Sequence, residues 1–253
     1  MNEVKRLLSF VRRAVDDYEM IDEGDRIAVG VSGGKDSLAL LSALARLRLF
    51  YPKKFEVVAI TVDMGFEGAD YCGVQALCDE LKVKYIIERT EIAKIIFDVR
   101  RESNPCSLCA KMRRGSLHAA AVNAGCNKVA LGHHYDDAVE TFMMNLFFEG
   151  RIGCFSPKSY LSNRRITLIR PLIYAQEKDV RYFARRQALP VTESLCPEDH
   201  ATEREKMKQL LHTLERDNEG LRHRIFHAMC KSEVDGFALH GRYPDAGKLS
   251  DNE

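Results

Sequence analysis

The sequence predicts an α/β protein built on a parallel β-sheet, and three observations support this fold class. Apolar runs typical of buried strands alternate with helical patterns through the first 150 residues. Glycine-containing turns follow two of the predicted strands, one after Val31 and one after Leu131. The chain of 253 residues is long enough for one large α/β domain with an extension.

The predicted elements follow one another in a regular order. The first 150 residues contain predicted strands at 26–31, 55–63, 83–89 and 127–133, and predicted helices at 36–50, 69–82, 106–124 and 136–150. Beyond residue 150 the pattern loosens to a loop, one short strand that ends at Pro171, and helices over 177–189 and 203–217. We therefore expect four segments, namely an N-terminal helix (1–22), the α/β domain (23–190), a helical segment (191–236) and a polar tail (237–253).

The charge of the chain is uneven, although its formal net value is only +1. Residues 151–190 contain nine Lys and Arg against two Asp and Glu, and such a basic block is a candidate surface for a polyanion. A solvated basic face would give the same composition. No apolar run reaches the length of about 18 residues that a membrane span needs, and the N-terminus has no apolar signal core. We expect a cytoplasmic protein with no membrane partner.

The stretch SGGKDS, residues 32–37, lies between a predicted strand and a predicted helix. Gly33 and Gly34 allow a sharp turn and a close approach to an anion, which the first amides of the helix would bind. Lys35, Ser32 and Ser37 add donors for phosphate oxygens. Asp36 fits an anion site when it binds Mg²⁺, which bridges a carboxylate to phosphates. The adjacent glycines differ from the Walker pattern, and a simple capped turn is the alternative interpretation.

A second turn, LGHHYDDAVET, ends a predicted strand and opens a helix at residues 131–141. Acidic residues are favoured in a first helical turn in any case, which accounts for Asp136 and Asp137. The preceding Gly132, His133 and His134 have no such explanation, and two His with two Asp could bind a metal.

Two of the eight cysteines, Cys106 and Cys109, form a CxxC pair in NPCSLC, and Cys196 lies in SLCPEDH. A single CxxC is ambiguous among zinc, iron–sulfur and redox chemistry. Three thiolates make an incomplete zinc site but suit a four-iron cluster whose fourth iron stays open. Spacing alone does not bring Cys196 to the pair.

Four stretches together give a specific resemblance: SGGKDS, PCSLCAKMRRGSLH, LGHHYDDAVET and IRPLIYAQEKDV. Over about residues 1–230 the chain resembles the tRNA 2-thiocytidine synthetase family of the PP-loop ATP pyrophosphatases. The resemblance implies an ATP-pyrophosphatase fold, with the CxxC helix inside the domain at 23–190. It also implies ATP, Mg²⁺ and a [4Fe–4S] cluster on Cys106, Cys109 and Cys196, with Cys109 and Cys196 in catalysis beside Lys35 and Asp36. The implied nucleotide site contains Ser32, Gly33, Gly34, Lys35, Asp36, Ser37, Asp63, Gly132, His133 and Asp137.

The family resemblance implies thiolation of cytidine 32 in the tRNA anticodon loop. It also implies a sulfur donor such as a cysteine desulfurase, and a homodimer. Cations that could contact RNA phosphates are Arg113, Arg114, Arg151, Lys158, Arg164, Arg165, Arg170, Arg181, Arg185 and Arg186.

Three other functions remain open at this point. A sulfurtransferase could carry a persulfide on Cys109 or Cys196 without a cluster. A ligase of the tRNA-lysidine synthase type could adenylate RNA and use an amine, and it would need none of the three cysteines. A non-catalytic ATP- or RNA-binding regulator is the third alternative.

Overall fold

The computed structural model describes residues 3–100, 105–193, 195–196 and 203–240, which fall into two compact units. The sheet unit comprises Met1–His134 and Lys158–His200, and the helical unit comprises Tyr135–Pro157 and Ala201–Glu253. This division groups residues 135–157 with the C-terminal helices rather than with the sheet. No helix in the described part of the chain has the length and apolar character that crossing a membrane requires.

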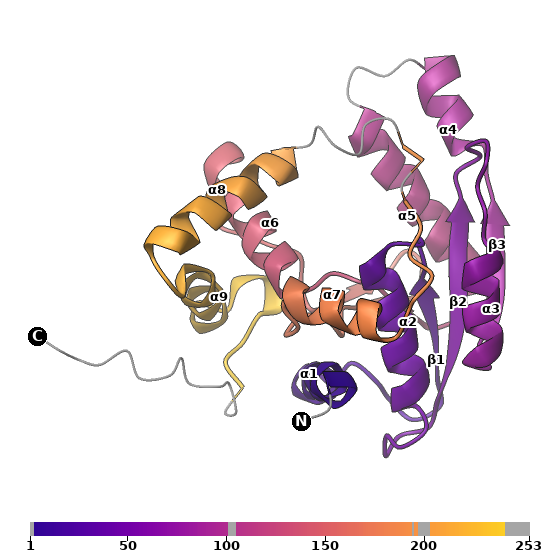
Figure 1. Ribbon diagram of the computed structural model, residues 1–253, viewed down its shortest axis with the longest axis horizontal. Coiled ribbons are helices and arrows are strands. Elements are labelled where there is room, and N and C mark those ends of the chain that lie inside the picture. The colour runs from indigo at the N-terminus through magenta and orange to yellow at the C-terminus, as the bar shows by residue number, and fades with distance from the viewer. Residues whose placement is uncertain (1–2, 101–104, 194, 197–202, 241–253) are drawn as a thin grey trace, which may run out of the picture. The chain divides into compact units, whose positions relative to one another are not determined.

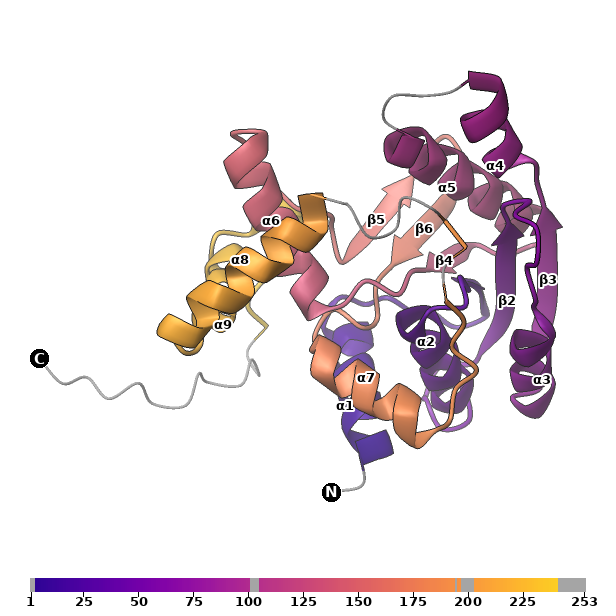
Figure 2. The same cartoon turned by 45° about the horizontal axis from the view of Figure 1, so that its top comes forward.

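The sheet unit contains a six-stranded, mostly parallel sheet in the order β3-β2-β1-β4-β6-β5. Its strands are β1 (Asp25–Gly30), β2 (Phe55–Asp63), β3 (Lys84–Arg89), β4 (Lys128–Ala130), β5 (Lys158–Leu161) and β6 (Ile166–Ile169). All neighbouring pairs are parallel except β5 with β6. The predicted α/β class with a parallel sheet is confirmed (Figure 1, Figure 2).

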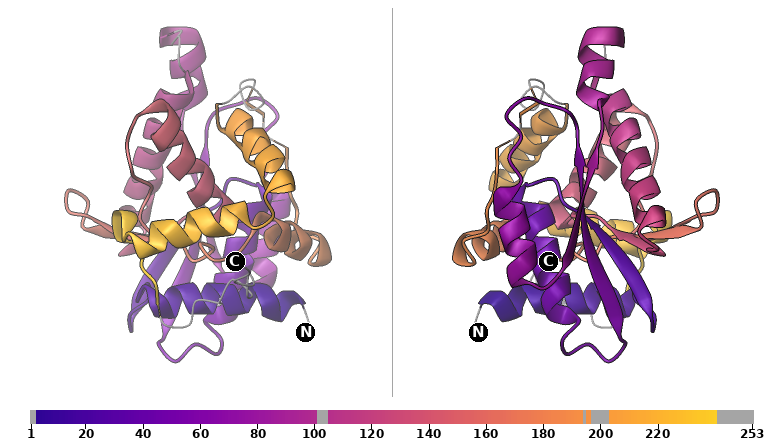
Figure 3. Two further views of the ribbon diagram at one scale, coloured as in Figure 1. Left: turned by 90° about the vertical axis from the view of Figure 1, so that its left-hand side faces the viewer. Right: turned by 90° about the vertical axis from the view of Figure 1, so that its right-hand side faces the viewer.

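Helices cover both faces of this sheet, as Figure 3 shows for α3 and α5 on opposite sides. The helices of the sheet unit are α1 (Glu3–Asp17), α2 (Lys35–Leu47), α3 (Cys72–Glu80), α4 (Ile92–Lys94), the π-helical η1 (Ile95–Arg100), α5 (Pro105–Asn123) and α7 (Glu177–Arg186). Helix α2 is buried along most of its length, from Ser37 to Ala45. It packs against α1 and α7 as well as the sheet, which explains why its pattern is almost continuously apolar.

The other face of the sheet packs on the C-terminal half of α5. Leu117, Ala120 and Ala121 of α5 form one apolar cluster with Val58 and Val129 of the strands. The N-terminal half of α5, which carries the CxxC pair, contributes no fully buried side chain. The helix is therefore anchored at one end, and its cysteine-bearing end remains accessible to a ligand.

The strand order places β1 between β2 and β4. The chain therefore continues from β1 to β2 on one side, and β4 is later added on the other side of β1. Ligands of open α/β sheets bind at such a switch point, beyond the carboxyl ends of the strands. Both predicted glycine turns, after β1 and after β4, lie at this edge.

Residues 151–176 differ from their prediction. One short strand was expected, but the structure has the antiparallel hairpin β5–β6, with Arg164 and Arg165 in its turn. Strand β6 pairs with β4, so the hairpin forms the sheet edge opposite to β3. The two strands have four residues each, too short for a clear alternation of apolar and polar side chains.

The helical unit consists of α6 (Tyr135–Phe148), α8 (Glu203–Asp217), α9 (Leu221–Lys231) and the short 3₁₀-helix η2 (Val234–Gly236). Its core contains a stacked ring pair, Tyr135 and Phe226, with centroids 4.4 Å apart, and Phe237 packs edge-on against Phe226 at 5.5 Å. Phe237 is fully buried, so the start of the predicted polar tail belongs to this core. The rest of that tail, 241–253, lies outside the described residues.

Candidate active site

The turn after β1 has the shape of an anion-binding loop. Gly33 has a φ of +83°, which glycine adopts without strain, and Gly34 is extended and precedes the first residue of α2. The Ser32 amide donates to Ser37 Oγ at 3.1 Å, and the Ser37 hydroxyl donates to the Gly34 carbonyl at 2.9 Å. Both serines therefore hold the turn in shape, and the first amides of α2 are presented at its mouth.

Lys35 lies in a small network of charges. Its ammonium contacts Asp36 Oδ2 at 3.0 Å and Glu177 Oε1 at 3.2 Å, and the same Glu177 oxygen accepts a hydrogen bond from Arg181 at 3.0 Å. Burial alone would lower the pKa of Lys35, but Asp36 and Glu177 raise it above its usual value. Lys35 is thus a fixed cation. Glu177 was missed in the sequence, where only its i,i+4 spacing to Arg181 gave a signal.

Asp36 has one oxygen that the structure leaves without a hydrogen-bond partner. Asp36 Oδ1 is buried, and His134 Nε2 lies 3.8 Å from it, beyond hydrogen-bond distance. A buried carboxylate oxygen without a partner is costly, and a cation would satisfy it. This observation fits the magnesium role that the sequence predicts for Asp36.

Gly132 allows the turn after β4 to approach the start of α2 closely. A Cβ at Gly132 would lie 3.2 Å from both the Asp36 carbonyl carbon and the Ser37 amide nitrogen. The structure therefore brings Gly132 and His134 to the phosphate turn. His133 follows Gly132 in the same loop, at the edge where β4 ends.

Asp63 ends β2 at the same edge of the sheet. Its Oδ1 accepts the Gly65 amide at 2.9 Å, and its carbonyl accepts the Thr90 hydroxyl at 2.7 Å. One carboxylate oxygen thus closes the turn after the strand.

Asp137 lies in the helical unit, where two arginines meet the acidic residues of α6. Arg204 of α8 lies 3.6 Å from Asp137 and 3.5 Å from Glu140. Arg222 of α9 donates to Asp136 at 2.9 Å and lies 3.7 Å from Glu140. Burial, together with Asp137, raises the pKa of Glu140, while the two arginines lower it.

The acidic residues at the start of α6 therefore pair with arginines of the same unit. These ion pairs argue against a role of the acidic residues as metal ligands. The sequence alone could not identify these arginines as partners of the acidic residues, because each lies more than 60 residues away from the carboxylate that it contacts.

The three candidate cluster cysteines lie on two segments of the sheet unit. Cys106 is exposed on the first turn of α5, Cys109 is half-buried one turn later, and Cys196 lies on the segment after α7. Burial raises the pKa of Cys109, Arg113 opposes this shift, and Cys196 and Cys106 each raise the pKa further. No three described His, Cys, Asp or Glu side chains are gathered closely enough to hold a metal ion.

The segment that leads to Cys196 crosses the phosphate turn. The Thr192 amide donates to the Gly33 carbonyl at 3.1 Å, and a Cβ at Gly33 would lie 2.2 Å from Thr192 Oγ1. Two residues earlier in this segment, Pro190 packs on Gly73 of α3, where a Cβ would lie 2.9 Å from the proline ring. Two glycines thus make room for the segment.

Only some cations of the basic block, residues 151–190, lie on the surface. Arg164, Arg165 and Arg185 are exposed, but Arg170 at the end of β6 is 7% exposed and cannot follow an RNA backbone from the surface. Tyr160 of β5 is largely exposed.

Comparison with known proteins agrees with this geometry. The PP-loop domain family matches residues 4–215. A tRNA-cytidine(32) 2-sulfurtransferase of Geobacter metallireducens is 41% identical over 228 residues, which are 89% of each chain. Its counterpart in Citrifermentans bemidjiense is 42% identical over 216 residues, 84% of this chain and 85% of the relative.

Among solved structures, the U34-tRNA thiolase NcsA from Methanococcus maripaludis, with its [4Fe-4S] cluster, superposes with a TM-score of 0.73. It is 27% identical, and the match covers 89% of this chain and 77% of that chain. The resemblance inferred from the four motifs is confirmed by these comparisons. The chain belongs to the PP-loop family and, within it, to the tRNA-cytidine(32) 2-sulfurtransferases.

Proposed function

We propose that this chain is an ATP-dependent tRNA thiolase that replaces the C2 oxygen of cytidine 32 with sulfur. One observation carries the proposal: the glycine turn after β1 and the segment that contains Cys196 are joined by the Thr192–Gly33 hydrogen bond. The names of relatives at 41–42% identity support cytidine 32 over the uridine 34 of the more distant structural neighbour.

The first step needs ATP with its α-phosphate towards the base. The C2 oxygen of the pyrimidine attacks the α-phosphorus, the bond to the β-phosphate oxygen breaks, and pyrophosphate leaves. The first amides of α2 and the Lys35 ammonium stabilise the negative charge of the phosphates. Mg²⁺ at the unpaired Asp36 oxygen would neutralise the departing pyrophosphate. We assign Ser32, Gly33, Gly34 and Ser37 to the loop itself.

The remaining nucleotide contacts follow from the edge of the sheet. Asp63 ends β2, and Gly132 and His133 lie in the turn after β4, beside the loop after β1, where an adenosine would bind. Asp137 is the weakest of the proposed contacts because Arg204 neutralises part of its charge.

The second step exchanges oxygen for sulfur. A hydrosulfide attacks C2 of the adenylated base, the C2–O bond breaks, and AMP leaves with the oxygen. Three cysteine thiolates are the donor set of a [4Fe–4S] cluster with one open iron, and we assign them to Cys106, Cys109 and Cys196. When bound, such a cluster supplies the iron that carries the sulfur to be transferred. Burial raises the pKa of Cys109 and Arg113 opposes this only in part, so ligation to iron would have to stabilise the thiolate.

The partners follow from this chemistry. The substrate is the single-stranded anticodon loop, whose bases are accessible without unpairing a helix. The sulfur comes from a donor such as a cysteine desulfurase. The proposed homodimer rests on the family resemblance and not on this chemistry.

An anaerobic assay with purified protein, ATP, Mg²⁺, sulfide and a tRNA transcript tests the proposal. Pyrophosphate release together with 2-thiocytidine in the digested RNA is the expected result. Pyrophosphate without thiolation would favour a ligase that uses an amine. The absence of both products would favour a non-catalytic binding protein. Thiolation by iron-free protein would favour a persulfide carrier.

Matched variants separate the cluster ligands from other thiols. Cys106→Ala, Cys109→Ala and Cys196→Ala should each lower the iron content and abolish thiolation. Cys72→Ala is the control, because Cys72 is also an exposed thiol on the first turn of a helix. Equal iron content in all four variants would exclude the proposed ligand set.

A further inference from the structure

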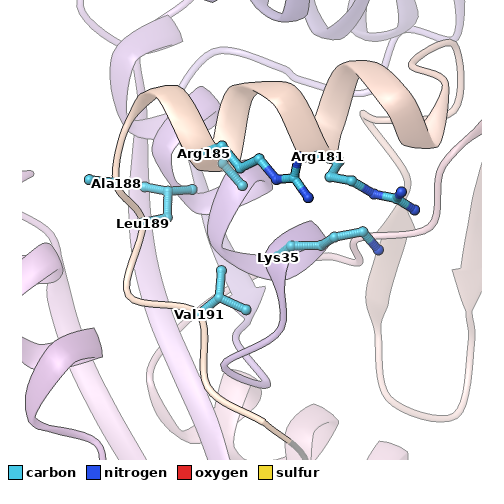
Figure 4. Close-up of a pocket in the computed structure, with 7 residues that line it drawn as sticks. Lys35, Arg181, Arg185, Ala188, Leu189 and Val191 are labelled. Carbon is cyan, nitrogen blue, oxygen red and sulfur yellow. The ribbon is translucent and has the colours of Figure 1, made fainter.

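A cavity of 310 Å³ opens in the sheet unit between the start of α2 and the C-terminal half of α7. Its lining consists of Lys35, Arg181, Ala184, Arg185, Ala188, Leu189 and Val191. Figure 4 shows the charged ends of Lys35, Arg181 and Arg185 on one side of this cavity, and Leu189 and Val191 on the other. The cavity therefore has a cationic end and an aliphatic end.

The cationic end carries a charge that the described residues do not neutralise. Lys35 and Arg181 share Glu177 as their acidic partner, and Lys35 also contacts Asp36. Arg185 is exposed, and no described carboxylate lies within ion-pair distance of it. An unpaired arginine beside two paired cations is suited to a phosphate, which it can bind with two parallel hydrogen bonds.

At the aliphatic end, one of the two apolar side chains is open to solvent. Val191 is 50% exposed although it lies beside the buried Leu189. Helix α7 ends just before, and Ala188 turns the chain with a φ of +46°, which directs Leu189 and Val191 to the cavity wall. A flat apolar group with a phosphate next to it, as in a nucleotide, matches both ends of the cavity.

We propose that this cavity binds one unpaired nucleotide of the substrate RNA, next to the modified base. This inference rests on the proposed function. Its phosphate binds Arg185 and Arg181, and its base packs on Val191 and Leu189. Lys35 belongs both to the phosphate turn and to the cavity wall, which places this nucleotide beside the site of adenylation. The phosphates of ATP would bind the amides of the turn, so Arg185 remains available to bind the phosphate of the RNA nucleotide.

Binding of a tRNA transcript, measured over a salt series, tests the inference, with ATP affinity measured separately without RNA. Arg185→Glu is compared with Arg186→Glu, because Arg186 is the next residue of α7 and is also exposed but does not line the cavity. Arg185→Glu should weaken tRNA binding about tenfold more than Arg186→Glu. It should also reduce the slope of log affinity against log salt by about 0.7 to 0.9, the value for one phosphate contact. ATP affinity should not change.

The uncharged variant Val191→Ser tests the aliphatic end. It should weaken tRNA binding several-fold and leave the salt slope unchanged, because base packing releases no counterions. Equal tRNA binding by Arg185→Glu and Arg186→Glu, with wild-type binding intact, would overturn the inference and leave the proposed function standing. A weaker ATP affinity of Arg185→Glu would assign the cavity to ATP instead. Failure of the wild-type protein to bind tRNA would reject the proposed function and this inference with it.

Discussion

The amide of Thr192 donates a hydrogen bond to the carbonyl of Gly33 at 3.1 Å, although the two residues are 159 positions apart. Gly33 belongs to the phosphate turn, and Thr192 precedes Cys196 by four residues on the same segment. A nucleotide that reshapes the turn would therefore act on the segment that carries the third cysteine. The two halves of the proposed reaction, adenylation and sulfur transfer, meet at this contact.

Gly33→Ala should destabilise the protein by about 1–2 kcal/mol for the left-handed conformation alone, and further through collision with Thr192 Oγ1. Gly34→Ala is the matched control, since Gly34 is extended and its Cβ would meet Ser32 Oγ at an ordinary 3.5 Å. Urea unfolding is measured for both variants, and Thr192→Ala together with the double variant Gly33→Ala, Thr192→Ala completes a double-mutant cycle. The cycle should recover the collision energy but not the cost of the conformation. Additive effects would mean that the two residues do not meet in solution.

Glu177→Gln should lower kcat more than it changes the KM for ATP. The variant keeps the size of the side chain but removes the anion that holds Lys35 and Arg181 in place. The site then has a higher net positive charge, which maintains ATP binding, but Lys35 is no longer held in its orientation. Because Glu177 raises the pKa of Lys35, its removal should also move the alkaline limb of the kcat profile to lower pH. Asp179→Asn, on the same helix, pairs with Arg6 and should leave both kinetic constants unchanged. An unchanged pH profile in Glu177→Gln would refute the positioning role.

His118 should make the protein less stable in mild acid. Burial on α5, with Arg164 and Arg114 nearby, lowers the pKa of His118 below 6.5. The unfolded chain then binds a proton more readily than the folded one, so stability is present above pH 6.5 and is lost as the pH falls below it. His118→Gln should show a smaller loss of unfolding free energy between about pH 7 and pH 5.5. Parallel curves for wild type and variant would contradict this assignment.

Charge reversal at Arg164 and Arg165 should weaken tRNA binding and flatten its salt dependence. Both arginines lie in the exposed turn of the β5–β6 hairpin, at one edge of the sheet. The double variant Lys82→Glu, Lys84→Glu is the control, because these exposed lysines lie at the start of β3 at the opposite edge. Filter binding over a salt titration separates the two. Indistinguishable slopes would exclude the hairpin from the RNA surface.

Local patterns predicted the part of the fold that positions the nucleotide. Strand β1, the glycine turn and α2 follow each other without interruption, so composition and periodicity suffice there. The short strand expected before Pro171 is β6, but its partner β5 and helix α9 were not predicted, since β5 is short and α9 has a mixed polar and apolar sequence. The burial of Phe237 was also missed, because it depends on packing against Phe226 rather than on its own neighbours in the chain.

The site shows the same division. The residue types of the turn, the histidines and the cysteines were evident from the sequence, but their partners were not. Glu177, Thr192, Arg204 and Arg222 act through contacts with residues distant in the chain, for which the sequence has no local signal. Ser32 and Ser37 were expected to donate to phosphate, and the structure shows them bonded within the turn.

Mass spectrometry of the nucleosides of total tRNA, from cells with and without this gene, tests whether the protein thiolates cytidine. We predict that 2-thiocytidine alone disappears when the gene is absent and returns with the wild-type gene, but not with Cys196→Ala. A full complement of 2-thiocytidine without the gene would contradict it, and the ATP site would then serve another acceptor.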